Sequence, residues 1–357
     1  MAAYSNEHKC FRFAHKRPMQ DNAAMNFLVL SGGVGGAKFA DGMAKSVGAE
    51  NLTVVVNTAD DHELYGLHIS PDLDSVMYAL AGINNNETGW GLVEETWHNF
   101  EMLQAYGTDP WFRLGDKDLA THFLRTNMLK AGATLTEVTR TLAQKLGIKA
   151  RILPMTDARV RTIVDTDEGL LPFQEYFVKR KCEPIVHALI FEGAAEAEAS
   201  LQVIRAIETA NTIIIAPSNP YMSIDPILAL QGVKDALLNA SAPIIAVSPI
   251  VGGLAVKGPL AKVMAEQGKT PTPVAIAEHY ADFINGFVLD EQDRDMLGDI
   301  VTLGLGPHVT NTLMNTAEDR ASLACEVVNY ADKLRPESLG GCKLDEVATQ
   351  KQLSAGS

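Results

Sequence analysis

Residues 25–57, MNFLVLSGGVGGAKFADGMAKSVGAENLTVVVN, constrain the fold more than any other part of the sequence. The apolar run at 27–30 meets a glycine turn and a helix-compatible stretch, and residues 52–56 form a second apolar run. Short apolar runs bounded by turn residues are typical of buried strands. Strand, helix and strand in this order form a βαβ unit, which places both strands in a parallel sheet.

The same design returns later in the chain. Apolar runs lead into polar or glycine-rich loops in NTIIIAPSNP (211–220), APIIAVSPIVGG (242–253), FINGFVLD (283–290) and DIVTLGLG (299–306). We interpret each as a strand, and residues 317–334 as a closing helix. The sequence therefore predicts an α/β, Rossmann-like fold with an open, mostly parallel sheet and its ligand crevice at the carboxyl ends of the strands.

The middle of the chain has a different character. Residues 118–132 and 134–147 have helical spacing, and the second begins with a Thr134/Glu137 capping pattern. Residues 150–180 alternate β-branched runs with turns, which indicates a small β-rich segment. We predict an inserted helical and β segment at about 85–195 within a core of 25–335.

The two ends of the chain fall outside this core. Residues 1–24 are polar, basic and without periodicity, and they lack the apolar stretch of a secretory signal. We interpret 1–24 as a disordered extension and 336–357 as a C-terminal tail.

Charge and cysteine content exclude several classes of protein. The formal net charge is −14, so there is no basic excess to meet nucleic acid or an anionic membrane. No run of about 18 apolar residues predicts a membrane span. The four cysteines are scattered without a C-x-x-C pair, which is typical of reduced thiols. We expect a cytoplasmic protein.

The glycine turn SGGVGGAKF (31–39) offers backbone N–H groups at a helix N-terminus, where an anion binds well. The candidate phosphate-binding glycines are Gly32, Gly33, Gly35 and Gly36. Neither common nucleotide motif fits, because Lys38 replaces the third glycine of G-x-G-x-x-G, and Ala37 and Phe39 flank that lysine where a Walker loop needs glycine and a hydroxyl residue. A tight turn without a ligand is the alternative.

The second cluster, NTADDHELYGLHISPDLDS (57–75), is rich in acid. Its aspartates, Asp60, Asp61, Asp72 and Asp74, offer oxygen ligands that favour Mg²⁺, which commonly takes one or two carboxylates plus substrate phosphates. Asp72 has a second interpretation as the cap of a helix beginning near Leu73. We interpret His62 and His68 as solvated loop histidines.

Two further loops have weaker signals. Arg113 follows Trp111 and Phe112, a setting suited to a flat aromatic ligand with an anionic tail, and the alternative is a charged surface loop. Asp118 is an N-cap candidate for the helix that follows. Ser218 and Asn219 in PSNP, and the VSPIVGG loop, offer hydroxyl, amide and backbone groups to a nucleotide.

In chain order, SGGVGGAKF, VVVNTADD, SPDLDSVMYALAG, LGDKDLATHFLR, LPMTD, APSNPYMSI and VSPIVGG resemble the 2-phospho-L-lactate transferases of coenzyme F420 biosynthesis. The resemblance covers about Met25 to Leu334. It implies a phosphotransferase for substituted phosphate groups. Such an enzyme moves a phospholactyl, phosphoenolpyruvyl or phosphoglyceryl group from a guanosine diphosphate-linked donor to the ribityl hydroxyl of the deazaflavin Fo, and releases GMP.

The resemblance also implies roles for single residues. Asp60 and Asp74 would hold Mg²⁺, and Asp74 and Arg113 would lie at the Fo site. The four glycines, with Ser218 and Asn219, would hold the guanosine diphosphate part, and the protein would be a homodimer. We expect an aspartate, Asp61, to orient the attacking hydroxyl, since transfer of a phosphoryl-type group needs chiefly positioning and charge neutralisation.

Two other functions stay open at this point. The gluconeogenesis-factor proteins share the glycine loop and the core fold but resemble regulators that bind a nucleotide sugar. PDLDS, LGDKD and ATHFLR favour the transferase over that family. The broken G-x-G-x-x-G disfavours an NAD-dependent dehydrogenase. The sequence does not choose between lactate, enolpyruvate and glycerate on the donor.

Overall fold

Seven parallel strands make one central sheet in the order β14-β13-β10-β9-β1-β2-β5. The computed structural model describes residues 25–256 and 258–335, so the predicted extension at 1–24 and tail at 336–357 lie outside the described residues. The strands are β1 (Phe27–Ser31), β2 (Leu52–Val56), β5 (Arg151–Pro154), β9 (Thr212–Ile215), β10 (Ile244–Val247), β13 (Gly286–Asp290) and β14 (Gly306–Thr310). The prediction of an open parallel α/β sheet is confirmed.

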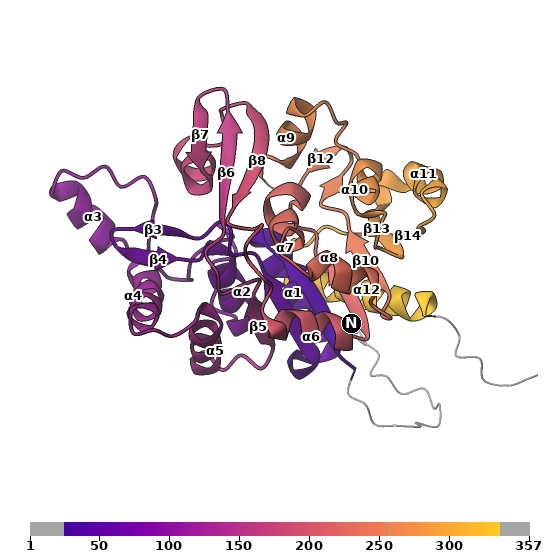
Figure 1. The fold of residues 1–357 in the computed structure, drawn as a ribbon, viewed down its shortest axis with the longest axis horizontal. Coiled ribbons are helices and arrows are strands. Elements are labelled where there is room, and N and C mark those ends of the chain that lie inside the picture. Colours follow the sequence, from indigo (N-terminus) through magenta and orange to yellow (C-terminus); the bar gives the residue numbers. More distant parts are fainter. Residues whose placement is uncertain (1–24, 257, 336–357) are drawn as a thin grey trace, which may run out of the picture.

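Helices cover both faces of this sheet (Figure 1). On β1, Leu28 and Leu30 join one core while Phe27 and Val29 join the other, because successive strand residues point to opposite faces. Helices α6 (Leu201–Thr209), α7 (Asp225–Leu228), α8 (Val233–Leu238), α9 (Leu260–Glu266), α10 (Pro273–Tyr280) and α11 (Leu297–Thr302) pack on the Leu28 side. Helices α1 (Gly33–Val47), α2 (Pro71–Ala81), α5 (Leu135–Lys145) and α12 (Ala317–Leu334) pack on the Phe27 side.

Smaller elements extend from the sheet at the left and top of Figure 1. The hairpin β3 (His62–Leu64) and β4 (Leu67–Ile69) lies with α3 (His98–Ala105) and α4 (Asp116–Lys130) at one end. Strands β6 (Arg161–Thr166), β7 (Gly169–Pro172) and β8 (Val186–Glu192) form an antiparallel sheet, and β11 (Ile250–Val251) pairs with β12 (Leu254–Ala255). Within the range 85–195, β5 is therefore an edge strand of the central sheet, while α3, α4 and the three-stranded sheet lie outside it.

One local prediction from the sequence is confirmed and another is wrong. The Thr134/Glu137 capping box is present at α5, as predicted. The strand predicted at 299–306 is wrong, because residues 297–302 form α11, Gly304 has φ +79°, and the strand β14 begins only at Gly306. A short apolar run does not distinguish a buried helix from a strand. None of the described helices is long and apolar enough to cross a membrane.

Candidate active site at the carboxyl edge of the sheet

The order in which strands are added to the sheet reverses between β1 and β9, which are parallel neighbours. From β1 the chain proceeds to β2 on one side, and from β9 it proceeds to β10 on the other. In open α/β sheets this switch point is where ligands bind. The glycine turn after β1 meets the PSNP loop after β9 there, because the Ser218 hydroxyl donates to the Gly32 carbonyl at 2.8 Å and accepts from the Gly32 N–H at 3.3 Å.

The glycines allow these two loops to approach closely. A Cβ atom on Gly35 would lie 2.3 Å from the Pro217 carbonyl oxygen, and one on Gly36 would lie 2.7 Å from the Ser218 hydroxyl. A Cβ atom on Gly32 would lie 2.6 Å from that of Ser223. Loop packing therefore accounts for three of the four glycines without a ligand, and Gly33 (φ +63°) has the left-handed conformation. The N-cap residue of α1 is Gly32, which has no side chain to cap the helix, and backbone N–H groups of a helix N-terminus suit an anion.

The acidic loop contacts the glycine turn directly, since β2 pairs with β1. The side-chain amide of Asn57 donates to Asp60 Oδ2 at 3.0 Å and to Asp72 Oδ2 at 3.1 Å. The Gly33 backbone also donates a hydrogen bond to Asp72. Helix α2 begins at Pro71 without a side-chain cap, so Asp72 is not the helix cap that the sequence allowed but a link between the two loops.

Two buried carboxyl groups lie around Asn57, and burial disfavours their charged form. Desolvation, reinforced by the neighbouring Asp72, raises the pKa of Asp60 well above its usual value. Desolvation also raises the pKa of Asp72 to about 6. Among the described residues, the Oδ1 atoms of Asp60 and Asp61 are buried without a hydrogen-bond partner. Orphaned carboxylate oxygens beside a second carboxylate fit a hard cation such as Mg²⁺.

Both loop histidines differ from the sequence interpretation. The His68 ring lies 2.9 Å from Asp61 Oδ2, to which the Ser70 hydroxyl also donates at 2.8 Å. The His62 ring packs edge-on against Phe112 with centroids 4.6 Å apart, and burial lowers its pKa to about 4. The prediction that these rings are solvated is wrong, because residues 112–126 fold over the β3–β4 hairpin, which no local pattern indicates.

Asp74 has partners different from those of Asp60 and Asp72. Its two oxygens accept hydrogen bonds from the Arg125 guanidinium, at 3.0 Å from Nη1 to Oδ2 and in a short contact from Nη2 to Oδ1. His122 lies 3.7 Å from Asp74 and 3.3 Å from Asp118. Ligand atoms of Asp74, Asp118 and His122 come within 4.8 Å of one another, which makes this trio a second candidate metal group.

A spacing pattern in the sequence indicates part of this cluster, and the local interpretation missed it. Asp118, His122 and Arg125 are spaced by four and three residues, which places them on one helix face. Asp118 is not the N-cap of α4, which begins at Asp116, and Glu95 instead accepts hydrogen bonds from the backbone of Lys117 (2.6 Å) and Asp118 (3.2 Å). Asp118 accepts from the Tyr78 hydroxyl at 2.6 Å.

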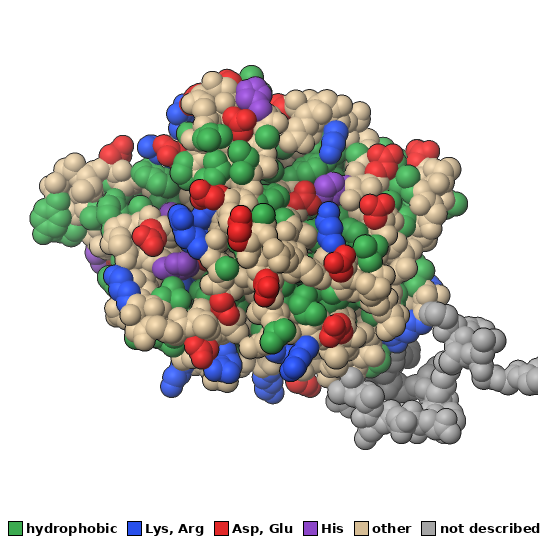
Figure 2. Space-filling model, viewed as in Figure 1, with side chains coloured by type: hydrophobic (Ala, Val, Ile, Leu, Met, Phe, Trp, Pro, Cys, Tyr) green, Lys and Arg blue, Asp and Glu red, His purple; other side chains and the backbone are tan. Residues whose placement is uncertain are grey.

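Arg113 is exposed and stacks over aromatic rings. Its guanidinium carbon lies 4.3 Å from the centroid of Trp97 and 5.4 Å from that of Phe100. Met102 in α3 and Tyr106 directly after it are exposed apolar side chains, and hydrophobic side chains gather at the left tip of Figure 2, where Figure 1 places α3. Arg113 therefore belongs to a partly exposed aromatic surface, and no hydrogen bond or ion pair between described residues joins it to the acidic loop.

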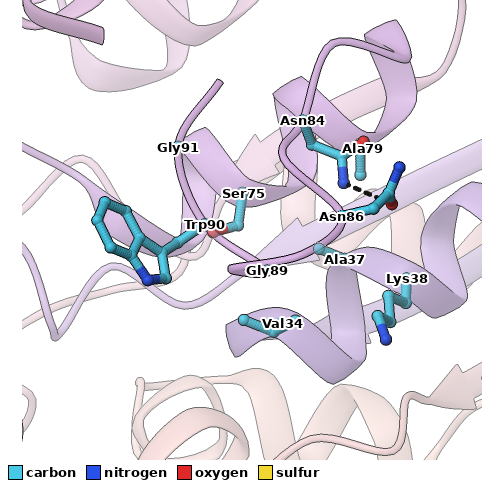
Figure 3. Close-up of a pocket in the computed structure, with 10 residues that line it drawn as sticks. All are labelled: Val34, Ala37, Lys38, Ser75, Ala79, Asn84, Asn86, Gly89, Trp90 and Gly91. Carbon is cyan, nitrogen blue, oxygen red and sulfur yellow. Dashed lines mark hydrogen bonds between the residues drawn. The ribbon is translucent and has the colours of Figure 1, made fainter. Parts of the chain in front are cut away.

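Figure 3 shows a small hollow beside the glycine turn, about 10 Å³ in volume. Val34 and Lys38 of α1 form one wall, Ser75 of α2 lies behind, and Trp90 borders it. A larger hollow of about 440 Å³ lies along α10 and the residues before it, and none of the predicted site residues lines it.

Two predicted ligand residues have structural partners. Ser218 is engaged with Gly32, and the Asn219 side chain accepts from the backbone of Tyr221 at 3.1 Å and Met222 at 3.2 Å. Arg161, which the sequence interpretation missed, lies half-buried near Asp60 and Asp61. Its guanidinium donates to the Val160 carbonyl at 2.7 Å and forms no ion pair with a described residue.

The fold and the site define a doubly wound α/β protein with a glycine-rich strand-to-helix turn and a buried carboxylate cluster side by side at its switch point. The model of the 2-phospho-L-lactate transferase family (CofD) matches residues 27–328. The chain belongs to this family, and it is a transferase of coenzyme F420 biosynthesis.

Individual relatives support this membership. A phosphoenolpyruvate transferase of Streptomyces coelicolor is 39% identical over 317 residues, covering 87% of this chain and 99% of the relative. A 2-phospho-L-lactate transferase of Methanosarcina mazei is 39% identical over 301 residues, covering 84% of this chain and 99% of the relative. A solved Bacillus halodurans structure has a TM-score of 0.59 at 15% identity, covering 86% of this chain and all of that one, which shows a shared fold.

Proposed function

We propose that this protein transfers a phospholactyl, phosphoenolpyruvyl or phosphoglyceryl group from a guanosine diphosphate-linked donor to the ribityl hydroxyl of Fo. The hydroxyl oxygen forms a bond to the phosphorus that carries the three-carbon acid, the bond from that phosphorus to the GMP oxygen breaks, and the hydroxyl proton leaves. The observation that carries this proposal is the contact between the buried Asp60–Asp72 pair and the N-terminus of α1.

The carboxylates supply the ligands for Mg²⁺. Asp60 fits, because its Oδ1 atom is buried without a partner, and Asp72 lies beside it on the same amide. Asp74 stays a predicted ligand, since a carboxylate that accepts two hydrogen bonds from an arginine keeps further lone pairs. When bound, Mg²⁺ neutralises charge on the donor phosphates.

The donor would lie across the glycine turn. Its diphosphate meets the glycine-rich N-terminus of α1, while Ser218 and Asn219 hold the two loops in the shape that this requires. Arg161 would face the negative charge of the donor, and a guanidinium suits both phosphate and the carboxylate of the three-carbon acid.

The acceptor would enter from the α3 side. The half-buried rings of Trp97 and Phe100 under the exposed Arg113 suit a flat deazaflavin. Asp61, held by His68 and Ser70, would orient the attacking hydroxyl. A cytoplasmic homodimer is also part of this proposal, and it rests on the family resemblance.

A transfer assay tests the proposal. Purified protein, Fo and Mg²⁺ are mixed with guanosine diphosphate-linked lactate, enolpyruvate or glycerate, and products are identified by mass spectrometry. We expect a new deazaflavin product that needs the metal, and its mass identifies the donor. No product with any donor from folded protein would overturn the proposal and favour the nucleotide-sugar-binding regulator, which tight binding of a uridine diphosphate sugar would then support.

A further inference from the structure

One face of α4 is directed at the acidic loop. Arg125 is 1% exposed, and its guanidinium contacts both oxygens of Asp74. The same group lies 3.5 Å from the His68 carbonyl oxygen, and the neighbouring Thr126 hydroxyl accepts from the His68 N–H at 2.8 Å. A single turn of α4 therefore holds two separate parts of the acidic loop.

A guanidinium is expensive to bury, so this arrangement needs close compensation. The Asp74 carboxylate supplies an opposite charge in fork geometry, which fixes the plane of the carboxylate as well as its position. His122 packs between Asp74 and Asp118, and Tyr78 secures Asp118 from α2. The pair is therefore held by a rigid frame of two helices.

The same frame reaches the carboxylates around Asn57. Arg125 and Thr126 hold the backbone of His68, and the His68 ring holds Asp61 at 2.9 Å. Asp60 directly precedes Asp61 in the sequence. A change at Arg125 would therefore be transmitted both to Asp74 directly and to Asp61 through His68.

We propose that Arg125 is a positioning residue of the transferase, which fixes the Asp74 carboxylate in one orientation and steadies the Asp61 side of the acidic loop through His68. It acts through these side chains and touches no substrate. The inference rests on the proposed function, because Asp74 and Asp61 matter here as active-site carboxylates. Removing partners that orient metal-site carboxylates typically costs ~10–100-fold in metal affinity or activity.

The test compares Arg125→Lys, Asp74→Asn and the double variant with the full-length protein. Lysine keeps the charge but not the fork that contacts both carboxylate oxygens. Arg140→Lys, on the exposed surface of α5, is the matched control. We expect Arg125→Lys to weaken Mg²⁺ binding, measured by calorimetry without substrates, and to lower kcat, each by ~10-fold or more, with donor KM little changed. The control should behave as wild type.

The double variant separates positioning from general stability. If Arg125 acts chiefly through Asp74, adding Arg125→Lys to Asp74→Asn causes little further loss, whereas independent structural effects add. Full additivity, or wild-type Mg²⁺ affinity and kcat in Arg125→Lys, would overturn the proposal. If Arg125→Lys does not fold, the double variant Arg125→Gln/Asp74→Asn, which removes both charges of the buried pair, is compared with Asp74→Asn, which leaves the Arg125 guanidinium unpaired. The Mg²⁺ measurement is independent of turnover, so an inactive wild type would contradict the proposed function alone.

Discussion

Asp60 and Asp72 accept hydrogen bonds from the same nitrogen atom, the side-chain amide of Asn57, at 3.0 and 3.1 Å. Twelve positions separate these two aspartates in the sequence, and one follows β2 while the other lies in the first turn of α2. This amide and the Gly33 backbone only partly compensate two buried carboxyl groups, so burial raises the pKa of both. The pair lies where a donor diphosphate would need a cation, and a bound cation would favour its charged form.

Replacing either carboxylate of this pair with its amide should abolish the response to metal without loss of the fold. In Asp60→Asn and Asp72→Asn, mutual repulsion falls, so we expect the melting temperature without metal to be equal to or above that of the wild type. Addition of Mg²⁺ should raise the melting temperature of the wild type but of neither variant. A normal Mg²⁺-induced rise in both variants would contradict this assignment.

The raised pKa of Asp72, about 6 against 3.8 for the ordinary side chain, gives a specific pH dependence. Between these values the folded protein binds a proton that the unfolded chain has released. This group therefore stabilises the fold at low pH, and that contribution is lost as the pH rises through about 6. We expect the unfolding free energy of Asp72→Asn, relative to wild type, to increase from about pH 4.5 to about pH 7 in urea titrations without metal. A constant difference would refute the raised pKa.

The titration of His62 should have the opposite effect on the free energy of unfolding over a similar range of pH. Its folded pKa of about 4 lies below the ordinary 6.5, so the stability that it contributes is present above pH 6.5 and is lost as the pH falls toward 4. In His62→Gln this loss should disappear, and the same urea titrations measure it. Stability of the variant that falls with acid as steeply as that of the wild type would argue against a buried neutral ring.

Gly35 should not tolerate a side chain, whether or not the turn binds a ligand. In Gly35→Ala the new Cβ would lie 2.3 Å from the Pro217 carbonyl oxygen, so the PSNP loop must move, at a cost of ~1–3 kcal/mol. Gly298→Ala is the matched control, because it also lies in the first turn of a helix and nothing is within 4 Å. The control should gain up to ~1 kcal/mol in urea unfolding. Equal effects of the two changes would contradict the packing argument.

Arg161→Gln should raise the donor KM, since it removes a half-buried cation beside the acidic loop. In steady-state assays we expect the donor KM to rise ~10-fold or more and the acceptor KM to change little. Arg159→Gln is the control, because Arg159 is exposed and lies two residues before Arg161, in the segment that leads into β6. An effect on both variants alike would indicate a general charge effect in place of a donor contact.

The sequence alone determined the central architecture of this protein. The apolar runs at 27–30, 52–56 and 212–215 are buried strands in the structure because only an inner strand of a sheet with two covered faces is apolar on both sides. The turns that end them, at Gly32, Asn57 and Ser218, were placed at the ligand edge by the same reasoning, since parallel strands share one carboxyl edge.

Only the tertiary structure decided the partners within that edge. Local patterns left Asp72 between a metal ligand and a helix cap, made Asp118 an N-cap candidate and predicted solvated His62 and His68. The fold gives all four side chains partners outside their own local segment or element. Arg125 reaches Asp74 across fifty-one positions of sequence. Periodicity reports which face of an element is buried, but a hydrogen bond between two loops depends on how whole elements dock, and no local spacing encodes that docking.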